Sequence, residues 1–116
     1  MASGTCGPTT TWDFNETTGV LTIGGTGAIA DYCGGTVFSN SPLFEYSSDA
    51  TEIIINDGVT SIGIDAFYRF DKCTRIDIGK DVTFIGSSAF NECHNVTEIV
   101  FRGNQHTFGT ETNYGN

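Results

Sequence analysis

Three short segments of the chain alternate apolar and polar residues, and they recur every 23 residues. Within each segment the apolar positions are two residues apart, which is the period of a β-strand with one buried face. These apolar pairs are Ile53 and Ile55, Ile76 and Ile78, and Ile99 and Phe101. Because the copies follow one another at a constant offset and in the same direction, we expect them to lie side by side as parallel strands.

The repeated unit extends beyond these strands. Residues 51–73 and 74–96 are identical at nine of 23 positions. Each copy continues with a turn, a second extended segment (59–62 and 82–85), and an Ala-Phe pair that we place on a short helical turn. A period in the twenties is typical of leucine-rich repeats, in which each repeat buries its apolar face against its neighbours. The sequence therefore predicts a mainly β solenoid, a short leucine-rich-repeat-like array of parallel strands and short helical turns.

Residues 1–50 precede the repeats and are expected to cap the array. Within them, residues 9–23 alternate around a turn, which predicts a β-hairpin that lies on the open end of the first repeat. Residues 24–50 have no repeat register, so we expect irregular structure there, with a short helical piece at 43–48 after Pro42. The expected buried anchors of this segment are Tyr32, Phe38, Leu43, Phe44 and Tyr46.

Residues 97–116 begin a third copy but lack its Ala-Phe pair. They are therefore either a C-terminal cap or the start of a longer array. We interpret the whole chain, 1–116, as a single leucine-rich-repeat domain, in which repeats 51–73 and 74–96 lie between these two end segments.

The charge balance excludes several classes of partner. The chain has 14 Asp and Glu residues against 5 Lys and Arg residues, a net charge of −9. Such a surface repels nucleic-acid phosphates and anionic headgroups. The sequence has no run of 18 apolar residues, so we expect no membrane insertion. Met1–Gly4 resembles no signal peptide, and we expect a secreted protein whose signal peptide has been removed.

With these positions in view, the chain resembles the BspA-like (Treponema pallidum type) leucine-rich repeats of bacterial and protist surface proteins. Their repeat is similar to L-x-x-I-x-I-x-x-x-V-x-x-I-G-x-x-A-F-x-x-C. Residues 74–93 follow it at Ile76, Ile78, Val82, Ile85, Gly86, Ala89, Phe90 and Cys93. Phe70 and Cys73 depart from it, because Phe stands where Cys is usual and Cys where Leu is usual. The resemblance implies an extracellular or cell-surface, non-enzymatic protein used in adhesion to host proteins or other cells.

Sharper chemical interpretations are weaker than structural ones. Gly25-Thr26-Gly27 follows a predicted strand as in a dinucleotide fingerprint, but residues 31–36 break the helix that would hold the pyrophosphate. Cys93-His94 invites a zinc site, yet zinc needs four clustered ligands. No Ser, Cys or Thr lies in a recognisable nucleophile context. We therefore expect no cofactor, no metal site and no enzymatic activity.

The four cysteines divide into two pairs by position. Cys6 and Cys33 lie in the predicted cap. Either they form a disulfide that ties the N-terminal arm to the irregular segment, or both are free. Cys73 and Cys93 occupy apolar positions of the repeats, and we expect them to be buried free thiols.

The outward residues of the parallel strands form the candidate ligand-binding face. Three ladders are expected: Glu52-Arg75-Glu98, Ile54-Asp77-Val100 and Asn56-Gly79-Arg102. Exposed Ile54 and Val100 beside polar groups are typical of a surface that binds a protein, and Phe84 is a second exposed candidate. The expected partner is a protein or a glycan, and a homodimer through the open end of the solenoid is a further expectation. The alternatives are a structural spacer without a ligand, whose ladders are merely solvated, and a glycan-binding module.

Overall fold

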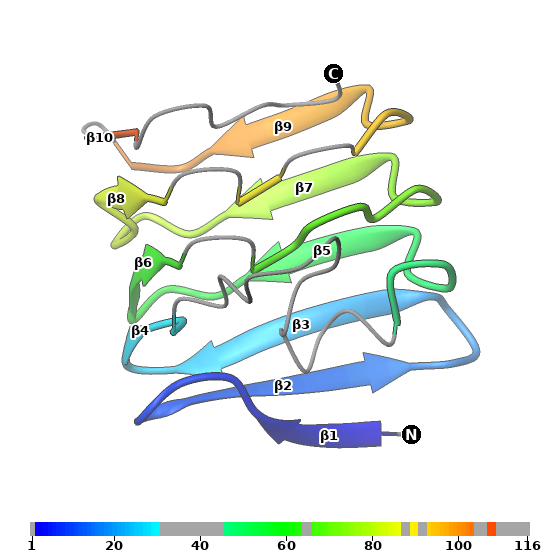
Figure 1. Cartoon of the computed structure of the whole chain (residues 1–116). Coiled ribbons are helices and arrows are strands. Elements are labelled where there is room, and N and C mark those ends of the chain that lie inside the picture. Colours follow the sequence, from blue (N-terminus) through cyan, green and yellow to red (C-terminus); the bar gives the residue numbers. More distant parts are fainter. Residues whose placement is uncertain are drawn as a thin grey trace, which may run out of the picture.

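The computed structural model describes residues 2–30, 46–63, 66–86, 89–90, 93–103 and 107–108. These residues form two β-sheets (Figure 1). The strands of the first sheet are β1 (Ala2–Thr5), β2 (Thr10–Asn15), β3 (Val20–Gly25), β5 (Glu52–Ile55), β7 (Arg75–Ile78) and β9 (Glu98–Phe101). The strands of the second sheet are β4 (Gly27–Ala28), β6 (Val59–Ile62), β8 (Phe84–Ile85) and β10 (Thr107–Phe108).

The first sheet joins an antiparallel part to a parallel part in the order β1-β2-β3-β5-β7-β9. Strands β2 and β3 pair as the predicted hairpin, and the Asn15 side chain accepts hydrogen bonds from the N–H groups of Thr17 and Thr18 in its turn. Strands β3, β5, β7 and β9 are parallel. Ile53 is opposite Ile76, and Ile76 is opposite Ile99. The predicted parallel strands and their 23-residue register are confirmed.

The second sheet is parallel throughout, in the order β10-β8-β6-β4. Between β3 and β10 the chain alternates between the two sheets, so the short strands stack beside the long ones (Figure 1). The predicted second extended segments correspond to β6 and β8. The predicted short helical turns are not shown, because described residues 66–69 and 89–90 form turns.

The N-terminal part differs from its prediction in three respects. The hairpin does not lie across the end of the first repeat, because β3 pairs directly with β5 and so continues the sheet. Residues 24–50 are not irregular throughout, because they contain β4, which pairs with β6. Strand β1, which pairs with β2, was not predicted. The register explains the second error: Leu21 is opposite Ile53, an offset of 32 residues instead of 23.

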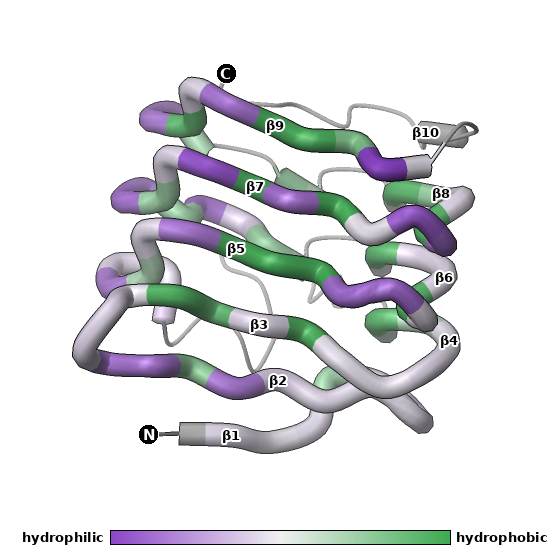
Figure 2. The backbone as a smooth tube through the Cα atoms, turned by 180° about the vertical axis from the view of Figure 1, so that it is seen from behind, coloured by the Kyte–Doolittle hydropathy of each residue, from purple (hydrophilic) through white to green (hydrophobic). Residues whose placement is uncertain are grey.

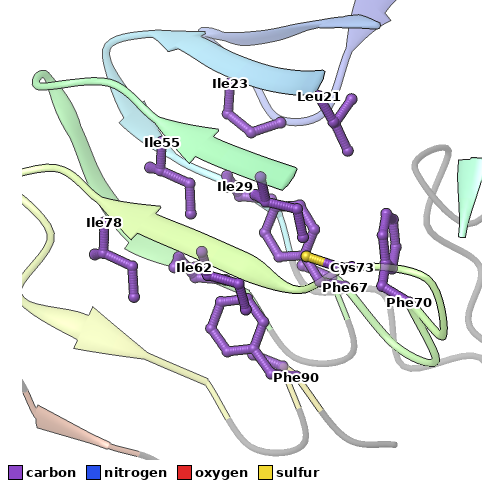
Figure 3. Close-up of a cluster of buried hydrophobic side chains, with 14 of the residues drawn as sticks. Leu21, Ile23, Ile29, Ile55, Ile62, Phe67, Phe70, Cys73, Ile78 and Phe90 are labelled. Carbon is purple, nitrogen blue, oxygen red and sulfur yellow. The ribbon is translucent and has the colours of Figure 1, made fainter. Parts of the chain in front are cut away.

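The hydrophobic core lies between the two sheets (Figure 3). Its inward-facing strand residues have buried side chains, in keeping with the alternation of green and purple along β7 (Figure 2). Phe67 and Phe90 come from equivalent positions of successive repeats, and their rings stack with centroids 5.4 Å apart. Tyr46, the one predicted anchor of residues 24–50 that is described, packs its ring 5.0 Å from that of Trp12; Tyr32, Phe38, Leu43 and Phe44 lie outside the described residues.

Burial weakens at β9, the last described strand of its sheet. Phe101 was expected to point into the core, but it is 38% exposed, whereas its neighbour Ile78 is fully buried. Ile99 is half-buried, while Ile76 beside it is fully buried. Inward residues of β7 have a described strand on each side, and those of β9 have one on only one side, which accounts for the difference.

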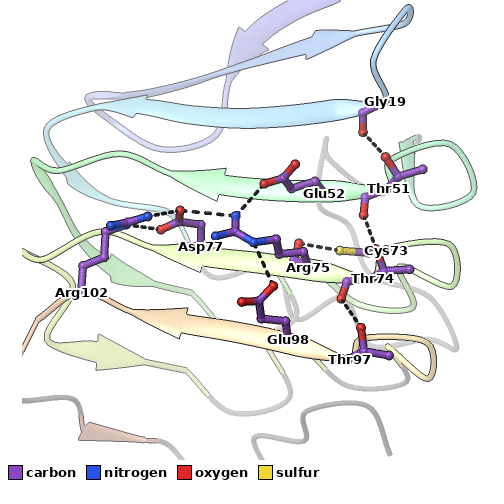
Figure 4. Close-up of polar contacts among 10 residues, drawn as sticks. All are labelled: Gly19, Thr51, Glu52, Cys73, Thr74, Arg75, Asp77, Thr97, Glu98 and Arg102. Carbon is purple, nitrogen blue, oxygen red and sulfur yellow. Dashed lines mark hydrogen bonds and ion pairs between the residues drawn. The ribbon is translucent and has the colours of Figure 1, made fainter.

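Hydrogen bonds between equivalent positions hold the repeats in register (Figure 4). The N–H and the hydroxyl of Thr74 both donate to the carbonyl oxygen of Thr51, at 2.9 and 3.3 Å, and Thr97 donates to Thr74 in the same way. The turns that follow the strands are also linked. The Lys80 N–H donates to the Asp57 carboxylate, and the Gly58 N–H donates to the Asp81 carboxylate, each at 2.9 Å. A one-residue slip would break every one of these bonds.

Two glycines on the same row of the sheet give a matched test of this packing. A Cβ on Gly79 would lie 2.7 Å from the Ile55 carbonyl oxygen, whereas a Cβ on Gly24 would have its nearest contact at 3.7 Å. We expect Gly79→Ala to lower the free energy of unfolding by about 1–3 kcal/mol and Gly24→Ala to change it by less than about 1 kcal/mol. Chemical denaturation measures both variants. Equal effects would show that the backbones of β5 and β7 are not packed as described.

The thiols give a second prediction. Cys73 and Cys93 are buried and free, as expected. Burial raises the pKa of Cys73 to about 11 and that of Cys93 to about 12. Since the thiolate is the reactive form, iodoacetamide at pH 8 should leave both cysteines unlabelled in the native protein and label both in denaturant. Peptide mass spectrometry checks this result. Rapid native labelling of either cysteine would contradict the described core.

Candidate functional site

The outward side of β5, β7 and β9, with the residue that follows each strand, is called the strand face below. Its residues are Glu52, Ile54, Asn56, Arg75, Asp77, Glu98, Val100 and Arg102. The register places Glu52, Arg75 and Glu98 in one row and Ile54, Asp77 and Val100 in the next. The structure thus brings together the residues of the first two ladders predicted from the sequence. Whether they bind a ligand stays a prediction.

Arg75 is the centre of the first row (Figure 4). Its Nη1 lies 2.7 Å from Glu52 Oε2 on β5, and its Nε lies 3.2 Å from Glu98 Oε1 on β9. Arg75 Nη1 also lies 3.5 Å from Asp77 Oδ2 on its own strand. One guanidinium therefore joins three strands of the parallel sheet.

Asp77 is more enclosed than expected for a residue on a solvated face. It is only 7% exposed, and both of its oxygens accept hydrogen bonds from Arg102. Arg102 Nε lies 2.5 Å from Oδ1, and Nη2 lies 2.7 Å from Oδ2, which is a bidentate pair. These hydrogen bonds from Arg102 are the main reason why the pKa of Asp77 lies below its ordinary value. Arg102 is two residues beyond Val100, the register partner of Asp77, so the pair is a diagonal neighbour contact that the predicted ladders did not include.

The apolar residues of the strand face are less exposed than predicted. Ile54 and Val100 are both half-buried, and they flank Asp77 on its two sides in the sheet. The polar neighbours of Asp77 along and across the sheet cover part of each side chain. The face therefore presents two partly covered apolar groups among paired charges.

A hollow of about 280 Å³ opens at the end of the strand face. It is lined by Ile54, Ile55, Asn56, Asp57, Asp77, Gly79 and Arg102. Gly79 stands between Asn56 and Arg102 in the third ladder, and no side chain fills the space between those two residues. Gly79 is buried, not outward-facing as the ladder implied. The glycine between two long polar side chains was the available signal for this hollow, and sequence reasoning missed it.

A second hollow, of about 410 Å³, lies among the turns that precede the strands. It is lined by Ser48, Asp71, Lys72, Thr74 and Asn95. All five residues are exposed, and Asn95 donates a hydrogen bond from its side chain to the Asp71 carbonyl oxygen, 2.5 Å away. This hollow is a surface depression between repeats at the opposite end of the strands.

The remaining sequence candidates lie apart from the strand face. Phe84 is 41% exposed, as predicted, and belongs to the second sheet. Cys6 is a buried free thiol that donates to Thr10 Oγ1, and Cys33 lies outside the described residues, so their pairing stays a prediction. Gly25 and Gly27 both have positive φ angles in the connection between β3 and β4. His94 is exposed.

Two wider features are findings only for the described part of the chain. Within it, no three His, Cys, Asp or Glu residues are grouped so that they could hold a metal ion. Among the same residues, no helix has the length and apolar character needed to cross a membrane.

The Asp77–Arg102 pair predicts a pH dependence. A carboxylate whose folded-state pKa is lowered stabilises the fold fully above its unfolded-state pKa of about 3.9, and the stabilisation is lost as the pH falls through the lower folded-state pKa. Asp77→Asn removes this titration. The variant should be less stable than the wild type at pH 7, and the difference should shrink between about pH 5 and pH 2. Urea unfolding across this range measures it, and a difference independent of pH would contradict the pairing.

The comparisons with known proteins agree with this architecture. A family model described as "BspA type Leucine rich repeat region (6 copies)" matches residues 37–115. A leucine-rich repeat protein from Eubacterium ventriosum ATCC 27560 has a similar structure, with a TM-score of 0.81 and 31% identity, over 94% of this chain and 28% of that one. No curated protein sequence matches the chain.

A second solved structure shows likeness of fold alone. It is a leucine rich cell surface protein from Faecalibacterium prausnitzii A2-165, with a TM-score of 0.51 and 24% identity, over 94% of this chain and 32% of that one. The present chain thus spans about a third or less of either neighbour. The family match covers more than half of the chain and agrees with the repeat pattern described above. The chain belongs to the BspA-type leucine-rich repeat family.

Proposed function

We propose that the chain is a short solenoid module of an extracellular or cell-surface protein, and that it binds a protein ligand through its strand face. The observation that carries this proposal is the placement of half-buried Ile54 and Val100 on either side of the paired Asp77. Protein interfaces commonly combine an apolar centre with a polar rim. Here Glu52, Arg75, Glu98 and Arg102 supply that rim.

The ion pairs make the strand face suited to binding because they hold it in one conformation. Arg75 is tied to Glu52 and Glu98, and Arg102 is tied to Asp77. Long charged side chains normally lose rotamer freedom when a partner binds them. Side chains that are already fixed lose less, so a partner gains more from each contact. The face is thus preorganised by contacts within the chain.

The cell-surface setting rests on the family and its neighbours. The family is that of the BspA-type repeats, and one similar structure is described as a cell surface protein. Repeat arrays of this type are generally scaffolds without catalytic groups, and the described residues offer a surface instead of an enclosed reaction site. An adhesive role toward host proteins or other cells follows from this setting.

A structural spacer is the second candidate function. The observation in its favour is that the charged residues of the strand face pair with one another, so the face leaves few unmet charges for a ligand. A spacer would hold a neighbouring domain of a longer surface protein in position and would bind nothing itself.

One pair of variants separates the two functions. Ile54→Thr with Val100→Thr removes apolar surface from the strand face and keeps β-branched residues in the strands. Phe84→Thr removes apolar surface from the second sheet and is the matched control. We expect the double variant to weaken binding by about tenfold or more and the control to leave it nearly unchanged. Biolayer interferometry against purified extracellular-matrix and cell-surface proteins measures the affinities, after circular dichroism has shown that each variant is folded.

Three results would count against the protein-binding proposal. Loss of binding in Phe84→Thr alone would move the site to the second sheet. Equal binding by all variants would separate the ligand from both apolar groups. A wild-type chain that binds no member of the panel would favour the spacer.

A further inference from the structure

We propose that the hollow between Asn56 and Arg102 is a binding site for one neutral sugar ring, which it recognises through neighbouring hydroxyl groups. It is called the sugar hollow below. The inference deepens the proposed function, because it assigns a ligand class to one end of the strand face. It is tested with free sugars, so its outcome does not depend on finding the protein ligand.

The shape of the site follows from the third ladder. The Asn56 N–H donates to the Ile23 carbonyl oxygen, and the Arg102 N–H donates to the Ile78 carbonyl oxygen, at 2.9 and 3.0 Å. The two residues therefore occupy equivalent places after β5 and β9, with Gly79 between them after β7. A side chain at Gly79 would collide with the Ile55 carbonyl oxygen and with the backbone of Asn56, at 2.7 and 2.8 Å. Only glycine fits there, and this leaves the space of about 280 Å³ open.

The polar groups around this space have hydrogen-bonding capacity left over. A guanidinium has five N–H donors, and the Asp77 pair uses one from Nε and one from Nη2 of Arg102. Three donors remain, on a group that Asp77 holds in a fixed plane. The Asn56 side chain is exposed and makes no hydrogen bond within the described part of the chain, so its amide can both donate and accept. Asp57 uses Oδ1 to accept from Lys80 N–H, and its second oxygen remains an acceptor.

This mixture of donors and acceptors fits hydroxyl groups. A hydroxyl donates one hydrogen bond and accepts others, so adjacent hydroxyls on a rigid ring can accept from Arg102 and Asn56 and donate to Asp57. Half-buried Ile54 also lines the hollow and offers an apolar contact for the C–H groups of the ring. The other hollow lacks this combination, because all five of its lining residues are exposed and Asn95 is already bonded to Asp71.

The local charges favour a neutral ligand over an anion. Two carboxylates, those of Asp57 and Asp77, line the sugar hollow with one guanidinium, and the whole chain has a net charge of −9. An acidic sugar would meet repulsion from Asp57, since the charge of Asp77 is already matched by Arg102. A neutral hexopyranose avoids this repulsion and uses the same hydrogen bonds. Either a polysaccharide or a glycoprotein could present such a ring.

Titration of the full chain with methyl hexopyranosides, followed by ¹H–¹⁵N NMR, tests the site. The probes are the methyl glycosides of mannose, galactose, glucose and N-acetylglucosamine, with methyl glucuronide as the anionic comparison. We expect at least one neutral glycoside to bind with a Kd on the order of 1 mM, with saturable shifts at the amides of Asn56, Asp57, Gly79 and Arg102. Methyl glucuronide should bind several-fold more weakly than the corresponding glucoside.

Matched variants locate the binding. Asn56→Ala removes the unbonded amide and should weaken binding about fivefold to tenfold. Asn95→Ala is the same change in the other hollow and should leave binding unchanged. Asp57→Asn keeps the shape of the site and should narrow the difference between glucuronide and glucoside. Ribonuclease B and its sugar-free form ribonuclease A then distinguish a glycoprotein ring from a free polysaccharide, and binding of either sugar source supports the site.

The proposal is overturned by any of three results. The first is no saturable shift with any neutral glycoside up to about 50 mM, which is well above the expected Kd. The second is equal binding by the wild type and Asn56→Ala, and the third is loss of binding in Asn95→Ala. None of these results bears on Ile54 and Val100 as contacts for a protein ligand, so failure of the sugar site and failure of the protein-binding face are distinguishable.

Discussion

The parallel pairing of β3, β5, β7 and β9 is the constraint on which the rest of the structure depends. Side chains alternate along each strand, so one register decides which residues enter the core and which reach the surface. The observed register buries Ile53 and Ile76 and, through the same pairing, aligns Glu52, Arg75 and Glu98 on the opposite side. Core and candidate binding face are therefore two consequences of one set of backbone hydrogen bonds.

Side chains reinforce that register at both ends of the strands. Before the strands, Thr74 and Thr97 donate to the repeat that precedes each of them. After the strands, the carboxylates of Asp57 and Asp81 accept backbone N–H groups from neighbouring turns. Acidic residues in the turns thus have a structural role, which accounts for part of the acidic composition without a cation. The sugar hollow lies beside these linked turns and inherits its shape from them.

The sequence predicted most of the repeats because their 23-residue period is unbroken between residues 51 and 101. It did not predict the first crossing between the sheets, because the offset from Leu21 to Ile53 is 32 residues and no fixed period connects them. Strand β1 was missed because Ser3, Gly4 and Thr5 carry no apolar alternation. The enclosure of Asp77 depends on Arg102, 25 residues away, and a pattern of single positions does not show such a diagonal pair. Ladders could be predicted, but the side-chain contacts between them could not.

The family gives the module its setting, and the strand face gives it a place to bind. Both rest on the register, which can be measured directly by NMR through contacts between backbone protons of adjacent strands. The account predicts contacts that pair Leu21 with Ile53, Ile53 with Ile76, and Ile76 with Ile99. A pairing displaced by one residue at any of these strands would turn Glu52, Arg75 or Glu98 toward the core. That result would contradict the strand face and everything proposed for it.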